Sequence, residues 1–313
     1  MNTRINYLKQ KANRLPQKPG IYLMKDAQSD ILYIGKAKQL KQRVSSYFRK
    51  NSQHTNKVLR LVHNVVDFET IVVDTEFDAL LLECQLIQQH RPIYNRQMTN
   101  FLNYEYITIE SGKIMRINTP TEAALGPFRL SKQLPEIIET LRETYQLPTV
   151  NPYKLLSLAK QLPLMKTMPL KEKNQELQLF FLGESELTFR YIDQRLNYFA
   201  EHLLFEQADQ LLRQKKLLQS FYREVRGVNT LVNLPEVRFE IPIDPQTIGE
   251  LPQVKVYQLS FGRIIHSEVV TSREEFIPAP LTQARPLQPA DLDPLHIVLR
   301  QLRLDLTRSE ARL

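Results

Sequence analysis

Two runs of apolar and aromatic residues near the amino terminus have the pattern of a β-hairpin. Gly20–Met24 and Ile31–Gly35 are rich in strand-forming residues, and the polar residues 26–30 join them. Strand formers on both arms with turn residues between them favour two paired antiparallel strands. The hairpin would bring Tyr22 and Tyr33 onto neighbouring strands.

A basic helical pattern follows the hairpin. Residues recur at spacings of four, three and four, which predicts a helix that begins directly after Gly35 and projects them from one face; they are Lys36, Leu40, Arg43 and Tyr47. A lysine, an arginine and a third tyrosine would then lie beside the two strand tyrosines. The plain structural alternative is a solvated basic face beside packed tyrosines.

The second informative pattern is an apolar helix over residues 75–91. Thr75 suits the N-cap, Asp78 stands at the capping-box position, and Pro92 ends the pattern. On the helical wheel Glu83 falls in the middle of the apolar face. A carboxylate there is costly unless it is paired, hydrogen-bonded or bound to a metal. The alternative is a glutamate at the edge of that face, reaching solvent.

The remaining patterns predict short elements of both kinds. Helices are predicted over 1–17 and 55–64, and two helical runs within 191–226 break near 203–205. Strands are predicted over 65–73, 254–259 and 263–270, with two more around Ser111 within 101–117. The prolines of 278–294 predict an extended linker. These elements predict an α+β fold: a small sheet with flanking helices, a mixed α/β middle region with a helical hairpin, and a short β-containing tail.

The composition is that of a soluble globular protein, because 42% of the 313 residues are apolar and 24% are charged. No run of 18 apolar residues occurs, and the first residues lack an apolar signal core, so we expect a cytoplasmic protein. Cys84 is the only cysteine. It excludes an internal disulfide and any cysteine-ligated zinc or iron-sulfur site built by one chain.

Positive charge is concentrated near the amino terminus. Residues 1–60 carry 14 Lys and Arg against two acids, whereas the other residues carry 28 bases and 32 acids. A concentrated basic field favours a polyanion, since phosphate contacts supply most sequence-independent affinity for nucleic acid. A basic surface without a partner is the alternative.

The hairpin contains the words Gly-Ile-Tyr and Tyr-Ile-Gly, followed by Lys36 and Arg43, and so resembles the GIY-YIG endonuclease family. The flanking LMKD and GKAK…RVSSYF resemble the amino-terminal domain of the UvrC family, the incision subunit of bacterial nucleotide excision repair, and its shorter homologue Cho. The resemblance implies a metal-dependent endonuclease that hydrolyses a phosphodiester bond of damaged double-stranded DNA. The incision would be the one on the 3′ side, leaving 3′-hydroxyl and 5′-phosphate ends.

The resemblance also implies the roles of particular residues. Glu83, with Asn95 after it, would be the metal ligand and would hold one Mg²⁺ or Mn²⁺, because these hard cations prefer carboxylate and phosphate oxygens. Arg43 would grip the scissile phosphate, and a tyrosine would orient or deprotonate the water. The implied catalytic set is Tyr22, Tyr33, Lys36, Arg43, Tyr47, Glu83 and Asn95, and the implied DNA-binding set is Lys36, Lys38, Lys41, Arg43 and Arg49.

The resemblance is weaker after residue 100. UvrC-like chains carry a strand at the place of residues 177–183, which we therefore expect here, but the cysteine cluster before it is missing, so no iron-sulfur cluster is expected. Residues 191–226 resemble the UVR motif, the helical hairpin by which UvrC and UvrB meet. Such a hairpin needs a partner for its apolar face, either UvrB or this chain's own middle region. The residues that match the core of the motif are Phe205, Glu206, Ala208 and Arg213.

These interpretations divide the chain into four regions. They are a GIY-YIG nuclease domain (1–100), a UvrC-like middle region without the cluster (101–189), a UVR-like hairpin (190–227) and a C-terminal β- and proline-rich region of unknown role (228–313). Two other functions stay open: a non-catalytic adaptor that binds DNA and UvrB, and a stand-alone GIY-YIG nuclease outside excision repair. Every expected site position is filled, which favours the nuclease.

Overall fold

The chain divides into two compact units. The computed structural model describes residues 2–49, 54–96, 98–99, 101–129, 132–243 and 251–310. The first unit comprises residues 1–102, 234–284 and 293–313, and the second comprises 103–233 and 285–292. Residues 244–250 and 311–313 of the predicted C-terminal region lie outside the described residues. The boundaries of the four predicted regions stay predictions.

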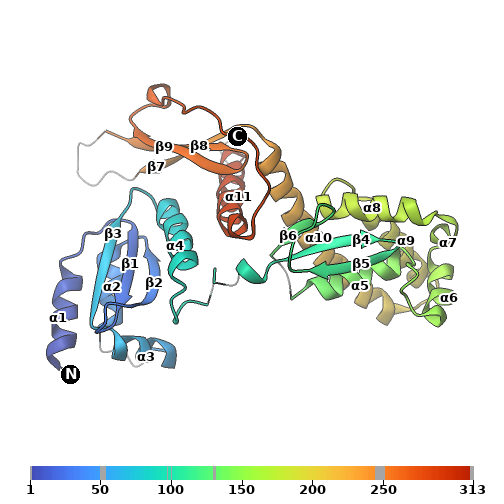
Figure 1. The fold of residues 1–313 in the computed structure, drawn as a ribbon, viewed down its shortest axis with the longest axis horizontal. Helices are drawn as coiled ribbons and strands as arrows, with labels where there is room; N and C mark the ends of the chain where they lie inside the picture. The colour runs from blue at the N-terminus through green and yellow to red at the C-terminus, as the bar shows by residue number, and fades with distance from the viewer. Residues whose placement is uncertain are drawn as a thin grey trace. The chain divides into compact units, whose positions relative to one another are not determined.

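The amino-terminal part of the first unit is a three-stranded antiparallel sheet with helices packed on it (Figure 1). The central strand is β1 (Gly20–Lys25), which pairs with β2 (Ile31–Ala37) on one side and β3 (Asp67–Val72) on the other. The predicted hairpin and third strand are therefore confirmed. The helices of this part are α1 (Asn2–Asn13), α2 (Leu40–Tyr47), α3 (Asn56–Asn64) and α4 (Glu76–His90).

Each face of this sheet is covered because alternate residues of β1 point to opposite sides. Tyr22 and Met24 share a core with buried residues of α1 and α2. Ile21 and Leu23 share the other core with Ala79 and Ile87 of α4. The sheet thus lies between α1 and α2 on one side and the Glu83 helix on the other.

The basic helix begins later than the sequence predicts. Lys36 pairs with Ile21 and Ala37 pairs with Gly20, so the hairpin continues past the Tyr-Ile-Gly word. Strand pairing satisfies the backbone there, and α2 begins at Leu40, whose N–H donates to the carbonyl of Lys18. The prediction that Lys36 lies on the helix is wrong. Leu40, Arg43 and Tyr47 do lie on α2.

The first unit also contains a C-terminal antiparallel sheet of order β7-β8-β9. Its strands are β7 (Val237–Ile243), β8 (Gln253–Ser260) and β9 (Arg263–Val270), so the predicted hairpin over 254–270 is confirmed. Gln258 of β8 is buried and exchanges hydrogen bonds with the backbone of Ala279 at 3.0 and 2.7 Å. This amide holds the extended proline-rich segment that follows the 3-10 turn η2 (Arg273–Glu275).

A long helix, α11 (Pro289–Glu310), ends the described chain. The predicted linker is therefore wrong over 289–294, where the prolines obscure a helix start. Pro289 occupies the first position, where a missing N–H costs no hydrogen bond. Asp291 accepts the backbone N–H of Gln288 at 2.9 Å and holds the start of the helix.

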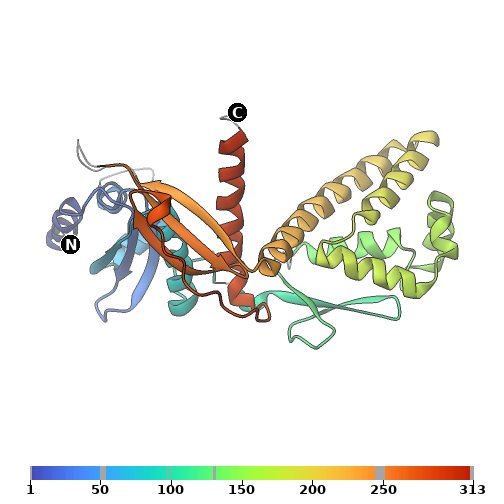
Figure 2. The ribbon, with the colours of Figure 1, turned by 90° about the horizontal axis from the view of Figure 1, so that it is seen from above.

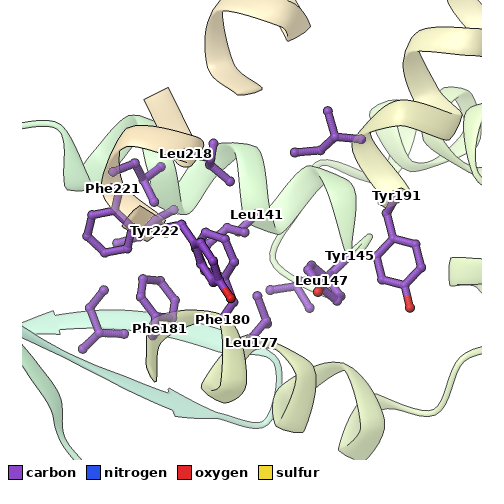
Figure 3. Close-up of a cluster of buried hydrophobic side chains, with 14 of the residues drawn as sticks. Leu141, Tyr145, Leu147, Leu177, Phe180, Phe181, Tyr191, Leu218, Phe221 and Tyr222 are labelled. Atoms are coloured by element: carbon purple, nitrogen blue, oxygen red, sulfur yellow. The ribbon is translucent and has the colours of Figure 1, made fainter. Parts of the chain in front are cut away.

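The second unit has its own three-stranded sheet and a layer of helices. The sheet order is β5-β4-β6, with β4 (Glu105–Glu110), β5 (Lys113–Ile117) and β6 (Leu125–Phe128); the 3-10 turn η1 (Phe101–Asn103) precedes it. The helices are α5 (Leu134–Thr144), α6 (Pro152–Gln161), α7 (Leu164–Thr167), α8 (Leu170–Leu182), α9 (Leu187–Glu201) and α10 (Phe205–Asn233). Aromatic side chains of α8 and α10 meet in its core (Figure 3).

The strand expected over 177–183 is wrong, because these residues end α8. Leu177, Phe180 and Phe181 are buried and recur at helical spacing, so one face of the helix covers the core. Gly183 ends the helix with a left-handed φ of 72°. Among the described residues, no helix combines the length and the apolar character that a membrane crossing requires.

Candidate active site

The hairpin register creates the centre of the site. Tyr22 pairs directly with Gly35 across β1 and β2. A Cβ atom at Gly35 would lie 2.4 Å from Tyr22 Oη and 2.9 Å from Tyr33 Cε1. The Tyr-Ile-Gly motif therefore ends in glycine because the rings of Tyr22 and Tyr33 occupy the space that a side chain at position 35 would need.

Three tyrosines from two strands and one helix meet at this point. Tyr22 Oη and Tyr47 Oη are 2.8 Å apart in a buried hydrogen bond. The ring centroid of Tyr22 lies 6.0 Å from that of Tyr33 and 5.8 Å from that of Tyr47. Burial is the main cause that raises the pKa of the Tyr22 and Tyr33 hydroxyls above the usual tyrosine value, and the neighbouring Tyr47 raises it further. The hydroxyls of Tyr22 and Tyr33 are therefore protonated at neutral pH, and each can donate a hydrogen bond.

Arg43 places a positive charge on the rim of this cluster. It lies on α2, one turn before Tyr47, and its guanidinium carbon is 5.2 Å from the centroid of the Tyr47 ring. A guanidinium over an aromatic face is attracted by the ring quadrupole. The stacking holds the planar fork of Arg43 beside the tyrosine hydroxyls while the residue stays exposed at the surface.

Glu83 reaches the site from α4. Its Oε1 accepts the backbone N–H of Lys36 at 3.0 Å. Burial raises the pKa of the Glu83 carboxyl, and the Lys36 hydrogen bond and the charges of Lys36 and Arg43 oppose that rise. Oε2 accepts no hydrogen bond from any residue that the structure describes. A half-buried carboxylate oxygen beside an arginine and a lysine is a suitable ligand for a divalent cation that also binds a phosphate.

Asn95 has a structural contact at the edge of the site. Its Oδ1 accepts the N–H of Ile34 at 3.0 Å, and its Nδ2 donates to the Ile34 carbonyl at 2.9 Å. Both polar atoms of the amide are thus used on the backbone of β2, one residue before Gly35. Asn95 fixes the outer edge of this strand rather than offering a free polar group.

Two residues that the sequence interpretation missed also belong to this surface. Lys36 Nζ is 2.5 Å from Glu76 Oε1 on the first turn of α4. The Lys36 hydrogen bond, with the charges of Lys38 and Arg300, lowers the pKa of Glu76. An acid in the first turn of a helix is common, so no local signal marks Glu76, and Arg300 lies on α11, far away in sequence.

Of the predicted DNA-binding residues, Lys36 binds Glu76 and Arg43 lies beside the tyrosine cluster. Lys38 and Arg49 are exposed, as is Arg43, whereas Lys36 and Lys41 are half-buried. Over the described part of the chain, no three His, Cys, Asp or Glu side chains gather as a metal-binding group would. Glu83 is therefore a candidate ligand that belongs to no such group of three, and water and substrate would supply the coordination positions that the protein does not fill.

The predicted partner-binding residues lie on the α9 and α10 hairpin of the second unit. The helices lie side by side (Figure 2), and most of the apolar face of the hairpin is buried in the unit's own core through residues such as Phe199, Leu211 and Phe221. Ala208 packs against that core, and Glu206 is exposed. Phe205 is 68% exposed at the turn, and Arg213 forms an exposed ion pair with Asp209 at 2.9 Å.

The amino-terminal part thus combines a three-stranded antiparallel sheet, tyrosines on two neighbouring strands, a helical arginine and one carboxylate on a covering helix. The sequence-family model that describes the UvrC-like GIY-YIG domain matches residues 18–96 of this chain. Residues 18–96 are therefore a GIY-YIG domain of the UvrC type. The domain extends from just before β1 to just beyond Asn95, and so contains every predicted catalytic residue.

Curated relatives agree with this assignment over the amino-terminal half. UvrABC system protein C of Caldanaerobacter subterraneus subsp. tengcongensis is 40% identical over 151 residues, which cover 46% of this chain and 24% of that protein. UvrABC system protein C of Clostridium botulinum strain Hall is 36% identical over 149 residues, covering 45% and 24%. The chain thus spans about a quarter of the length of these relatives.

A solved structure is also similar. The GIY-YIG N-terminal endonuclease domain of UvrC from Thermotoga maritima, bound to its catalytic divalent cation, magnesium, is 39% identical. The match covers 29% of this chain and 97% of that one, with a TM-score of 0.27.

Proposed function

We propose that this chain is a metal-dependent DNA endonuclease that makes the 3′-side incision of nucleotide excision repair. The observation that carries the proposal is the convergence of Arg43 and Glu83 on the tyrosine cluster of Tyr22, Tyr33 and Tyr47. These groups supply a phosphate clamp, a carboxylate for a cation and hydroxyls for the attacking water, which are the parts that phosphodiester hydrolysis requires.

The residues of the chain divide this work by chemistry. Arg43 presents a planar fork that matches two phosphate oxygens, and Lys36 adds positive charge close by. Tyr22 and Tyr33 orient the water. Because burial raises the pKa of both tyrosines, neither takes a proton from water unless a nearby cation stabilises the phenolate. Tyr47 and Asn95 hold the arrangement, through the Tyr22 hydroxyl and the β2 backbone respectively.

Glu83 would hold one Mg²⁺ or Mn²⁺ through the oxygen that accepts no hydrogen bond from the described residues. When bound, such a cation lowers the pKa of water and neutralises charge on the phosphate. Glu83 itself contributes a fixed anion, and Lys36 orients it through the backbone N–H. The Glu76 carboxylate on the first turn of α4 holds the Lys36 side chain in place.

The charge distribution predicts that DNA binding depends steeply on salt. If about five of the basic residues on this surface neutralise phosphates, affinity for duplex DNA is expected to fall roughly 10²- to 10³-fold between 50 and 200 mM salt. Fluorescence anisotropy with a labelled duplex measures the slope of the logarithm of affinity against the logarithm of salt concentration. Lys38→Gln should reduce the slope by about one unit, which corresponds to the loss of one phosphate contact. Lys216→Gln on α10 is the matched control and should leave the slope unchanged. Salt-independent affinity would contradict a phosphate-binding surface.

UvrB is the partner that this proposal assigns to the α9 and α10 hairpin. The intramolecular core leaves the turn of the hairpin open to a partner, where Leu203 is 71% and Phe205 68% exposed, and Leu212 further along α10 is 41% exposed. Exposed large apolar side chains on a helical turn favour contact with another helix pair. The long faces of the hairpin pack internally, and contact of the exposed tip with UvrB is the part that we propose.

Incision of a duplex with one bulky lesion tests the proposal. With Mg²⁺ or Mn²⁺ and with UvrA and UvrB, we expect a single nick on the 3′ side of the lesion, read on a sequencing gel with each strand labelled in turn. Omitting the metal should abolish the nick. Omitting UvrA and UvrB should abolish it on damaged DNA if the chain acts in excision repair.

Two results would lead to another function. A metal-dependent nick that needs neither lesion nor UvrB would identify a stand-alone nuclease. No nick under any condition, with DNA and UvrB binding intact, would identify a non-catalytic adaptor.

A further inference from the structure

The C-terminal sheet contacts the helix that carries Glu83. Tyr257 Oη on β8 donates to Asp78 Oδ1 at 3.0 Å and lies 2.8 Å from Thr75 Oγ1. Lys255 Nζ, on the same strand, lies 3.0 Å from Asp78 Oδ2 and 2.8 Å from Asp74 Oδ2. Strand β8 thus binds the start of α4 with two side chains from about 180 residues away in sequence.

These contacts meet at the capping box of α4. Thr75 Oγ1 accepts the N–H of Asp78 at 3.0 Å, and Asp78 Oδ2 accepts the N–H of Thr75 at 3.0 Å. A capping box is normally complete within one helix turn. Here both oxygens of Asp78 have a further donor from β8, so the sheet binds the groups that fix the first turn of the helix.

An aromatic contact lies beside the polar one. Phe77, on the first turn of α4, is buried, with its ring edge-on to Phe239 of β7 at 5.4 Å and to Tyr257 at 5.1 Å. Phe239 and Tyr257 stack at 5.0 Å. Edge-to-face aromatic pairs fix orientation as well as distance, so the sheet restrains both the position and the rotation of this turn.

The same turn belongs to the active site on its other side. Glu76 lies between Thr75 and Phe77, and its carboxylate binds Lys36 Nζ at 2.5 Å. Glu83 follows two helical turns later, about 10 Å along the axis at 1.5 Å per residue. A rigid helix transmits a rotation of its first turn to Glu83, because the side chains of one helix move together.

We infer that the C-terminal sheet is a positioning module of the nuclease, in which Lys255 and Tyr257 hold the first turn of α4 and thereby aim Glu83 at the metal. The inference rests on the proposed nuclease function for its kinetic readout. It gives the C-terminal region of this chain a role: the sheet should affect the metal concentration that the reaction requires and leave the affinity for DNA unchanged.

Lys255 keeps its charge in this contact. Burial alone lowers the pKa of the ammonium, but the hydrogen bonds to Asp74 and Asp78 outweigh it and raise the pKa above the usual lysine value. Around neutral pH Lys255 is therefore a permanent cation between two carboxylates. Without it, the half-buried charge of Asp78 would keep only its capping contacts and the hydroxyl of Tyr257.

Two variants of the full chain test the inference. Lys255→Met removes the ion pairs, and Tyr257→Phe removes one hydroxyl while keeping the aromatic contact. Lys255→Arg keeps a positive charge at the same place and should retain the native behaviour. Tyr145→Phe is the matched control, because Tyr145 Oη forms an equally short 2.8 Å buried hydrogen bond with Thr188 in the second unit. Thermal unfolding of each variant shows whether its loss of stability exceeds that of the control.

Three readouts are compared. Hydrogen exchange followed by mass spectrometry reports on α4, electron paramagnetic resonance titration reports on Mn²⁺ binding without any reaction, and nicking at graded Mg²⁺ concentrations reports on the metal requirement. We expect Lys255→Met and Tyr257→Phe to exchange faster over 76–86 and to need about three- to tenfold more Mn²⁺ or Mg²⁺ for half-saturation, with the KM for DNA unchanged. Tyr145→Phe and Lys255→Arg should behave like the native chain.

Unchanged exchange and unchanged half-saturation in both variants would overturn the inference, as would a native chain that binds no Mn²⁺. An altered KM for DNA with an unchanged metal requirement would overturn it too, since that would make the sheet a DNA-binding element. If the native chain binds Mn²⁺ but nicks no substrate, the proposed function fails, and the exchange and Mn²⁺ measurements still decide the role of the sheet.

Discussion

Glu83→Gln is expected to lower the rate of metal-dependent nicking by roughly 10³-fold or more, because loss of a metal ligand removes several kcal/mol of charge stabilisation. Glutamine has the same shape, and its carbonyl oxygen can still accept the N–H of Lys36 that Glu83 Oε1 accepts at 3.0 Å. The fold and the hairpin should therefore stay intact. What disappears is the negative charge that a divalent cation requires.

Single-turnover nicking of a lesion duplex, with the native chain and the variant at matched DNA affinity, measures this effect. Glu69→Gln is the control, because Glu69 is an exposed carboxylate on β3 that pairs with Lys25 away from the tyrosine cluster. It should nick at the native rate. A Glu83→Gln chain that nicks normally, with an unchanged Mg²⁺ requirement, would show that another group holds the cation.

Local sequence signals were sufficient for the amino-terminal fold, whereas the roles predicted for the site residues came from the family resemblance. The hairpin of Gly20–Met24 and Ile31–Gly35 follows from strand formers around a polar turn, and the capping box of Thr75 and Asp78 is present as predicted. Glu83 stood out because a charge in an apolar helix face needs a reason. The hairpin and the capping box depend on residues that are near one another in sequence, whereas the contact that Glu83 makes is with the N–H of Lys36, 47 positions away.

The parts that could not be predicted depend on partners that are distant in sequence. Lys36 extends β2 because Ile21 is available to pair with it, although its spacing also fits a helix. Residues 177–182 lie on α8 because their apolar side chains meet the core of the second unit. The contact of Lys255 with Asp78 joins residues 177 positions apart, and no periodicity can reveal such a pair.

Gly35→Ala is expected to reduce nicking by roughly 10²-fold or more while the protein still folds, at a cost of about 1–3 kcal/mol in the free energy of unfolding. The new methyl group would lie 2.4 Å from Tyr22 Oη and 2.5 Å from Tyr22 Cζ. Tyr22 is fully buried and hydrogen-bonded to Tyr47, so its ring cannot move without disturbing that pair. Misplacing a catalytic group by about 1 Å is enough to cost two orders of magnitude.

Gly20→Ala separates damage to the site from damage to the fold. Its Cβ would also meet an atom at 2.4 Å, but that atom is the Ile71 carbonyl oxygen of β3, and the next neighbour is Leu40. This variant should lose as much stability as Gly35→Ala, measured by urea unfolding, and yet nick at close to the native rate per folded molecule. If both variants lost nicking only in proportion to stability, the tyrosine cluster would be a packing feature; a selective loss in Gly35→Ala makes the positions of Tyr22 and Tyr33 part of the reaction.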